Sequence, residues 1–222
     1  MFFSKRGKKR EPKLPELYTE EEIKVLEAHI CKHFGEFANV LHEIVSPDIH
    51  VDIAVIEPSE ERNFYTMITM GMGAHRMNVP GELASHRLER AEAVICLPPD
   101  WDISAQDEKW YWPLRWLKIL ARLPIEHSTW LGWGHTVPNG EPFAENTNLC
   151  CMLLLSSDME FGESSSSCEM PDGSRVVFYQ MIPLYEDEMQ FKIENNAEAL
   201  LEQMPDSASV VVDIDRPSAF IS

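Results

Sequence analysis

The sequence is poor in basic residues and contains no long apolar run. Its 222 residues include 19 lysines and arginines against 37 aspartates and glutamates, which gives a formal net charge of −18. A chain this acidic repels phosphate backbones, because nucleic-acid affinity comes largely from lysine and arginine side chains that replace counterions. No apolar segment approaches the roughly 20 residues that a membrane-spanning helix needs, and no signal-peptide run follows the N-terminal basic residues. These absences argue against direct nucleic-acid binding and against membrane insertion.

Cysteines are also few, and their spacing does not suggest disulfide bonds. The five cysteines are odd in number and include no C-x-x-C pair. This pattern is typical of reduced, mostly buried thiols rather than of a disulfide framework. We therefore expect a cytoplasmic protein.

The motifs of nucleophilic and phosphate chemistry are missing as well. The chain has no Gly-x-Ser-x-Gly elbow, and Cys96 lies within an apolar stretch that does not favour a thiolate. Glycine-containing triplets at 71–73 and 132–134 are too short to cradle a phosphate. Ser164 to Ser167 are expected to form a flexible polar loop. We expect no enzymatic activity and no cofactor.

A metal-dependent enzyme is the weaker alternative, and it depends on His50 and Asp52. These two side chains are two positions apart on an expected strand, so both lie on one face and could reach a metal. A third ligand would have to come from His75, His86 or His135, and no spacing ties these histidines to the pair. The simpler interpretation is that His50 and Asp52 bond to each other or to the backbone.

The charge is unevenly distributed along the chain. The first thirteen residues hold six basic residues and one acidic residue, which leaves 13 basic and 36 acidic residues and a net charge of −23 behind them. We expect residues 1–15 to form a basic, poorly ordered arm and residues 16–222 to form one domain. The acidity gives solubility, and it also suits a basic partner whose association would be accelerated by charge.

Local patterns predict an α+β fold. Thr19 and Glu22 form a capping box, followed by a helical stripe of Ile23, Leu26, Ile30, Phe34 and Phe37. Alternating or continuous apolar residues predict strands over 50–56, 64–70, 87–97, 149–155, 175–182 and 210–214, the first two as a hairpin. Helices are expected over 112–122, with Pro113 near its start, and from 183 to about 204. Residues 159–172 are expected to be an acidic, serine-rich connection. Because strands and helices do not alternate regularly, we predict a single domain with a mixed, largely antiparallel sheet flanked by helices.

All six tryptophans lie between residues 101 and 133. Tryptophan anchors protein cores and is also enriched at binding hot spots. Core packing is the expectation for most of them. Trp101, which stands between Asp100 and Asp102 after a Pro-Pro bend, is expected to be the most accessible.

Seven short motifs occur in order along the chain. They are His50-Val51-Asp52-Ile53, Thr69-Met70-Gly71-Met72-Gly73, Arg87-Leu88-Glu89, Cys96-Leu97-Pro98-Pro99-Asp100-Trp101, the segment from Tyr111 to Arg122, Trp133-Gly134-His135-Thr136, and Ile182-Pro183-Leu184-Tyr185-Glu186-Asp187-Glu188-Met189. Together they resemble the suppressor-of-fused domain. Singly these motifs are weak, but together they follow the family order from about residue 48 to residue 205. The resemblance implies an α+β domain without enzymatic activity that binds other proteins.

The family resemblance also suggests two kinds of partner. Single-domain bacterial relatives are similar to immunity proteins encoded beside secreted toxins, and an acidic immunity protein would suit a basic toxin domain, which it would neutralise by occluding its surface. The alternative is a regulatory or scaffold protein that holds a peptide strand at a sheet edge, as a signalling or transcription partner would present it. The expected partner-contact residues are Asp100, Trp101, Asp102, Asp107, Glu108, Asp158, Glu160 and Glu163. An ordinary solvated surface is the simpler interpretation of these acidic residues.

Overall fold

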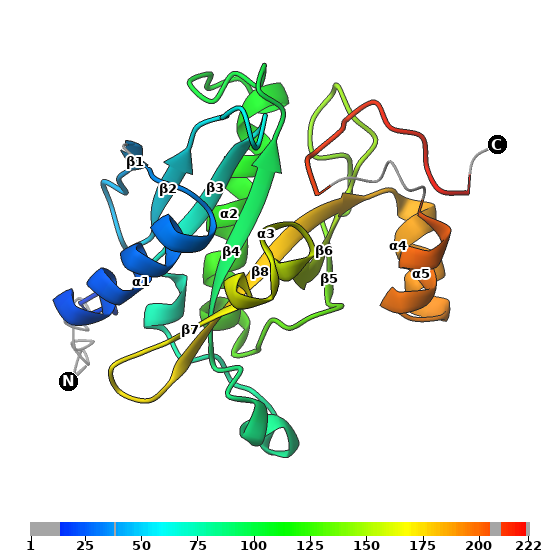
Figure 1. Cartoon of the computed structure of the whole chain (residues 1–222). Helices are drawn as coiled ribbons and strands as arrows, with labels where there is room; N and C mark the ends of the chain where they lie inside the picture. Colours follow the sequence, from blue (N-terminus) through cyan, green and yellow to red (C-terminus); the bar gives the residue numbers. More distant parts are fainter. Residues whose placement is uncertain (1–13, 38, 205–209, 221–222) are drawn as a thin grey trace, which may run out of the picture.

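An eight-stranded mixed sheet organises the molecule (Figure 1). The computed structural model describes residues 14–37, 39–204 and 210–220, so residues 1–13 of the expected arm lie outside it. The strands are β1 (Asn39–Leu41), β2 (Asp52–Ile56), β3 (Tyr65–Met70), β4 (Arg90–Leu97), β5 (Thr136–Pro138), β6 (Cys151–Ser156), β7 (Ser167–Glu169) and β8 (Arg175–Leu184). Their order is β1-β2-β3-β4-β8-β6-β5, with β7 paired to β8 off this path. Among these strands, only β4 and β8 pair in parallel, which confirms the predicted mixed, largely antiparallel sheet.

Helices cover both faces of the sheet. The α-helices are α1 (Glu20–His33), α2 (Glu108–His127), α3 (Asp158–Phe161), α4 (Glu186–Glu194) and α5 (Ala197–Gln203). The described residues also form short 3-10 helices, which are η1 (Met72–Ala74), η2 (Gly81–His86) and η3 (Glu163–Ser165). In the described residues no helix has both the length and the hydropathy that crossing a bilayer requires.

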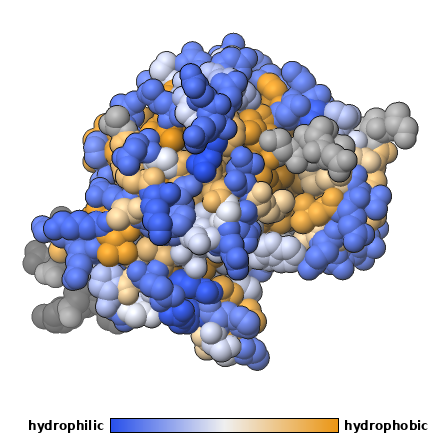
Figure 2. Space-filling view, in the orientation of Figure 1, coloured by the Kyte–Doolittle hydropathy of each residue, from blue (hydrophilic) through white to orange (hydrophobic). Residues whose placement is uncertain are grey.

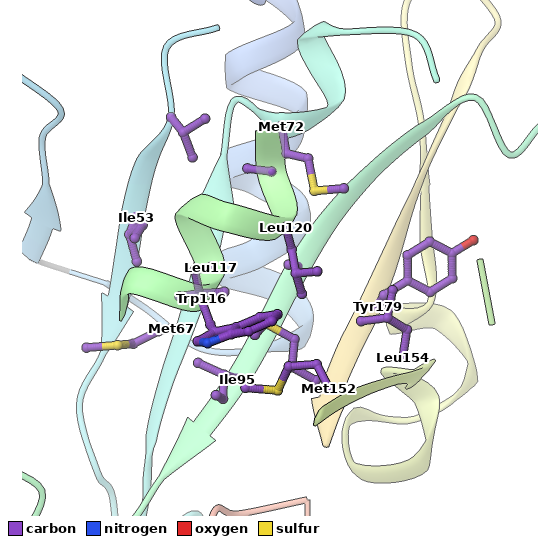
Figure 3. Packing of buried hydrophobic residues seen from close by; sticks show 14 of the residues in the cluster. Ile53, Met67, Met72, Ile95, Trp116, Leu117, Leu120, Met152, Leu154 and Tyr179 are labelled. Carbon is purple, nitrogen blue, oxygen red and sulfur yellow. The ribbon is translucent and has the colours of Figure 1, made fainter. Parts of the chain in front are cut away.

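Side-chain alternation along the strands separates two hydrophobic cores. In β4, Ala93 and Ile95 face the core beneath α2, whereas Val94 and Cys96 face the core beneath α1, α4 and α5. Figure 3 shows the first core, in which Trp116, Leu117 and Leu120 of α2 lie over Ile53, Met67 and Ile95 of the sheet. Both faces of the sheet are therefore buried, and any binding surface must lie at its ends, at its edges or on the helices.

The start of α1 confirms the predicted capping box. Thr19 Oγ1 accepts from the Glu22 amide, and the Glu22 carboxylate accepts from the Thr19 amide. Leu26, Ile30 and Phe34 are buried as expected, but Ile23 is 40% exposed. The apolar stripe of α1 is therefore narrower at its N-terminal end than the sequence pattern predicts.

The predicted hairpin is confirmed, and the glycine break after it forms a binding nest for a buried carboxylate. β2 pairs antiparallel with β3 from Asp52 opposite Met70 onwards. Gly71 then adopts a φ of +139°, and a Cβ there would lie 1.9 Å from the His50 carbonyl oxygen. The amides of residues 71–73 donate to Glu92, which also accepts from Thr69 Oγ1 at 2.5 Å and Tyr18 Oη at 2.7 Å.

Helix α2 begins earlier than predicted, because Pro113 does not mark its start. Asp107 caps the helix by accepting from the Lys109 amide. Pro113 removes the donor that would normally bond to the Lys109 carbonyl, and the Asn146 side chain donates to that carbonyl instead, at 3.4 Å. A partner distant in sequence thus lets a proline sit inside the helix.

Three other expectations differ from the structure. The 159–172 connection contains α3, η3 and β7, and Ser165 in the supposed flexible serine loop is fully buried. The last helix divides into α4 and α5, because Asn195 leaves the helical region and Asn196 caps a new helix by accepting from the Ala199 amide. Over 210–214, where a strand is expected, Val211 forms an isolated bridge to Cys96 instead of a strand.

Candidate functional site

The candidate site lies where β4 and β8 separate. The two strands pair from Arg90 opposite Val176 to Val94 opposite Gln180. Beyond that point β8 continues only with β6, and the C-terminal segment 210–220 takes its place beside β4. The Val212 amide donates to the Cys96 carbonyl at 2.9 Å. Figure 1 shows this segment in red, beyond the point where β4 and β8 diverge.

A groove of about 410 Å³ opens at this junction. Its lining consists of Pro98, Asp100, Trp101, Trp110 and residues 211–215. The carboxylates of Asp100, Asp213 and Asp215 belong to exposed residues. We call this the β4-end groove. It combines an apolar floor with three acidic groups at its rim, an arrangement that suits a cationic side chain of a partner.

Trp101 is buried, which corrects the prediction that it is the most accessible tryptophan. Its side chain is only 5% exposed, and Nε1 donates to the Trp110 carbonyl at 2.8 Å. The ring packs edge-on against Trp110 and Trp112. The indole is buried because folding the 98–107 loop back over α2 gives it both aromatic contacts and a hydrogen-bond acceptor.

Among the tryptophans, Trp133 has the largest exposure, at 44%. The expected core packing holds for Trp112 and Trp116, which are buried.

The other acidic residues near α2 are exposed but already have local roles. Asp102 accepts from the hydroxyl and the amide of Ser104, and these bonds lower the pKa of its carboxyl. Asp107 caps α2, and Glu108 pairs with Arg115 at 2.9 Å. Each of these carboxylates therefore already has a partner within the chain.

Asp158, Glu160 and Glu163 lie on the opposite face of the sheet. Asp158 and Glu160 belong to α3, and Glu163 begins η3. Phe161 of α3 packs against Phe34 at a centroid distance of 4.6 Å in the core beneath α1. A second groove of about 400 Å³ lies beside this contact and includes Glu36, Glu57 and Glu61 in its lining. The structure therefore divides the eight expected contact residues between two separate acidic surfaces.

The His50 and Asp52 side chains bond to each other, as the simpler interpretation predicts. His50 Nε2 lies 3.0 Å from Asp52, and His50 Nδ1 lies 2.7 Å from the Ser46 hydroxyl. Both ring nitrogens are thus engaged by protein groups. His75 instead contacts Glu16, and His135 packs against Trp130. No group of three potential metal ligands occurs among the residues that the structure describes.

A buried ion pair that sequence patterns do not reveal holds the C-terminal segment in place. Arg216 donates from both terminal nitrogens to Glu188, each at 2.6 Å, and the Glu188 side chain is fully buried. The Arg216 guanidinium also lies over the Tyr185 ring, 4.9 Å from its centroid. Because Asp213 and Asp215 belong to the same segment, this pair positions two of the three carboxylates of the β4-end groove. Nothing local in the sequence connects positions 28 residues apart.

All five cysteines are free, and four are buried. Burial raises the pKa of the Cys96 and Cys151 thiols to about 12. The prediction of reduced, mostly buried thiols is confirmed, and neither thiol is a nucleophile near neutral pH.

Comparisons with known proteins agree with this fold. The family model of suppressor of fused protein (SUFU) matches residues 47–217. An uncharacterized protein of Ureaplasma parvum is 27% identical over 204 residues, which span 90% of this chain and 96% of that protein.

Solved structures show the same architecture at low sequence identity. A putative SUFU homolog from Neisseria gonorrhoeae matches with a TM-score of 0.62 and 18% identity over 91% of this chain and 98% of that one. A chain of the Sufu–Fu complex matches with a TM-score of 0.66 and 14% identity over 93% and 94%. Drosophila Suppressor of Fused matches with a TM-score of 0.63 and 15% identity over 90% of this chain and 51% of that one. With the family model covering most of its length, the chain belongs to the suppressor of fused protein family.

Proposed function

We propose that this chain is a non-enzymatic protein-binding domain that neutralises a basic toxin by covering part of its surface. The observation that carries the proposal is the β4-end groove, in which Asp100, Asp213 and Asp215 surround an aromatic floor. The structure of the Sufu–Fu complex, which has the same fold, supports protein binding as the general activity.

The distribution of charge supports a basic partner. Behind the N-terminal residues the chain carries a net charge of −23, and such a field raises the rate at which a cationic protein is encountered. We propose the β4-end groove with Asp102, Asp107 and Glu108 as the main contact surface. The surface around α3, with Asp158, Glu160 and Glu163, is proposed as a second contact. Residues 16–222 are the proposed binding unit, and its free thiols support a cytoplasmic location.

The test begins with the identity of the partner. A pulldown from the native host names it, and a toxin gene immediately upstream would support the immunity role. The association rate of the isolated pair is then measured against salt for the wild-type chain and for two triple variants. One variant carries Asp100→Lys, Asp213→Lys and Asp215→Lys, and the matched variant carries Asp158→Lys, Glu160→Lys and Glu163→Lys on the other face.

We expect the first variant to associate at least about tenfold more slowly and with a flatter salt dependence. The second variant changes the net charge equally, so it separates a local contact from general attraction. Equal slowing in both variants would mean that the partner is attracted by the overall charge of the chain rather than by the β4-end groove. Unchanged rates in both would remove the electrostatic basis of the proposal.

A further inference from the structure

A third groove lies between α1 and the β1 edge of the sheet. Its volume is about 330 Å³. Leu17, Ile23 and Leu26 contribute apolar side chains from the α1 side, and Val40 and Met70 contribute them from the sheet. Glu27, His42, His50 and Asp52 also line it and supply its polar groups. We call this the α1–β1 groove.

β1 is an edge strand that provides an unpaired row of backbone groups beside this groove. It stands at the end of the strand order and, within the described residues, pairs only with β2. The sequence of β1, Asn39-Val40-Leu41, contains no proline or lysine that would discourage another strand from pairing. Val40 lines the groove, whereas Leu41 packs against the core beneath α2. Because side chains alternate between faces, a strand added to β1 would place every second side chain on the groove side.

Exposed apolar side chains are concentrated around the same edge. Half of the ten large apolar residues that are exposed in the described chain belong to two short segments: Leu14, Leu17, Ile23, Ile44 and Val45. The two segments are neighbours, since the Glu16 amide donates to the Asp48 carbonyl at 2.7 Å. Ile44 is 97% exposed and Val45 is 76% exposed. Figure 2 shows apolar surface beside α1 and near β1, as one of several apolar areas on this face. Apolar surface gathered in this way is typical of an interaction site.

We propose that the α1–β1 groove binds an extended segment of a partner protein, which adds to β1 as a further strand. The segment would alternate apolar residues, which fill the groove, with lysine or arginine. A basic segment is favoured because the chain carries a charge of −18, and the same charge opposes pairing with a second copy through this edge. The inference rests on the proposed protein-binding function, but it uses a different surface.

The probe is a displayed library of random linear peptides about ten residues long, a length that covers a typical strand. Peptides are selected on the full chain, and their Kd is measured on the wild type, on Ile23→Asp and on Ile193→Asp. Ile23→Asp places a charge in the groove at an exposed helical position, so the fold is retained. Ile193 of α4 is 60% exposed and lies outside the groove, which makes it the matched control. Amide hydrogen exchange of β1 is followed with and without peptide.

We expect the selected peptides to alternate apolar and basic residues. Their Kd should rise at least about tenfold in Ile23→Asp and stay unchanged in Ile193→Asp, and the β1 amides should exchange more slowly in the complex. Equal binding to both variants, unchanged β1 exchange, or no shared alternation among the peptides would overturn the inference. Sedimentation that shows a dimer lost in Ile23→Asp would assign the groove to a second copy and overturn it as well.

The two proposals fail separately. If the native partner responds to reversal of the β4-end groove but not to Ile23→Asp, and the library gives no alternating peptides, protein binding stands and the α1–β1 groove has no peptide role. If library peptides bind as expected while both charge-reversal variants associate with the native partner at the wild-type rate, only the electrostatic proposal fails.

Discussion

At the scale of single residues, the most constrained group is Glu92. Its side chain is fully buried, and five donors surround the carboxylate: three backbone amides and two hydroxyls. Burial raises the pKa of the Glu92 carboxyl, while the donors act in the opposite direction. Five donors and no acceptor around two oxygens suit the ionised form. The carboxylate thereby ties the turn after β3 to the middle of β4 and to the residue that precedes the α1 cap.

We predict that Glu92→Gln lowers the free energy of unfolding by about 2–4 kcal/mol, because its amide group would face donors rather than acceptors. Tyr18→Phe removes one donor and keeps the ring, so it should cost only about 1 kcal/mol. Urea unfolding of both variants measures the difference. A Glu92→Gln chain as stable as the wild type would show that the native carboxyl is protonated.

The Glu22 carboxylate should make stability depend on pH in the acid range. Desolvation would raise the pKa of this carboxyl, but hydrogen bonds from Thr19 and Arg90 outweigh it and hold the pKa below its ordinary value of 4.5. A lowered native pKa contributes stability that is complete above the ordinary value and is lost as the pH falls through the native value. The stability difference between wild type and Glu22→Gln should therefore be constant above about pH 5 and shrink below pH 4.5. Urea midpoints across this range provide the measurement, and a difference that grows on acidification would contradict the prediction.

At the scale of elements, the turn between β3 and η1 depends on a glycine for two separate reasons. Gly71 has a positive φ, and a Cβ there would meet the His50 carbonyl oxygen at 1.9 Å. Gly173 in the β7–β8 turn also has a positive φ, but nothing lies within 4 Å of its Cβ position.

Replacing each of these glycines by alanine separates the strain of a positive φ, which both share, from the steric clash with His50, which only Gly71 has. Gly173→Ala should cost about 1 kcal/mol, the usual strain of a left-handed alanine. Gly71→Ala should cost more than about 3 kcal/mol, because the backbone at His50, just before β2, must also move away from the new methyl group. Thermal and urea unfolding of the two variants give the comparison. Similar losses would mean that the turn relaxes without displacing the His50 backbone.

Elements whose signals are local could be predicted from sequence, and those that depend on distant partners could not. The Thr19–Glu22 capping box and the β2–β3 hairpin are determined by neighbouring residues, and both were correctly located. The predicted start of α2 at Pro113 was wrong, because the donor that replaces the missing proline amide comes from Asn146, which is distant in sequence. Trp101 was placed at the surface, because its acceptor at Trp110 becomes available only after the loop folds back. The expected contact residues, which stay a prediction, were chosen mainly for their acidity, but their division between two faces of the sheet follows from topology rather than from spacing.

At the scale of the whole molecule, the Glu188–Arg216 pair connects the C-terminal segment to the body of the domain. Both side chains are largely buried, at 0% and 11% exposure. Removing one partner of such a pair leaves an uncompensated buried charge, which is more costly than the pair is favourable. The segment also bonds through Ser218, whose hydroxyl donates to Asp187 at 2.6 Å.

We predict that Arg216→Ala lowers the free energy of unfolding by about 3–5 kcal/mol and speeds hydrogen exchange at the Val212 amide, which bonds to β4. Arg76→Ala is the control, because its pair with Asp172 is exposed on both sides and should contribute less than about 1 kcal/mol. Exchange measured by mass spectrometry or NMR follows the segment directly. An Arg216→Ala chain in which Val212 stays protected would show that the strand bridge to Cys96 is sufficient to hold the segment.

The parallel contact between β4 and β8 also determines the order in which the chain can assemble during synthesis. Strands β1 to β4 form a local antiparallel meander that ends at Leu97, whereas β8 begins only at Arg175. During synthesis the edge of β4 that will pair with β8 therefore stays unpaired until the chain beyond α2 has left the ribosome. Long-range pairing of this kind slows folding and exposes intermediates to association. The strand at the centre of the finished sheet is therefore exposed to association until β8 pairs with it, and residues 211 and 212 later cover the last part of the same edge at Cys96.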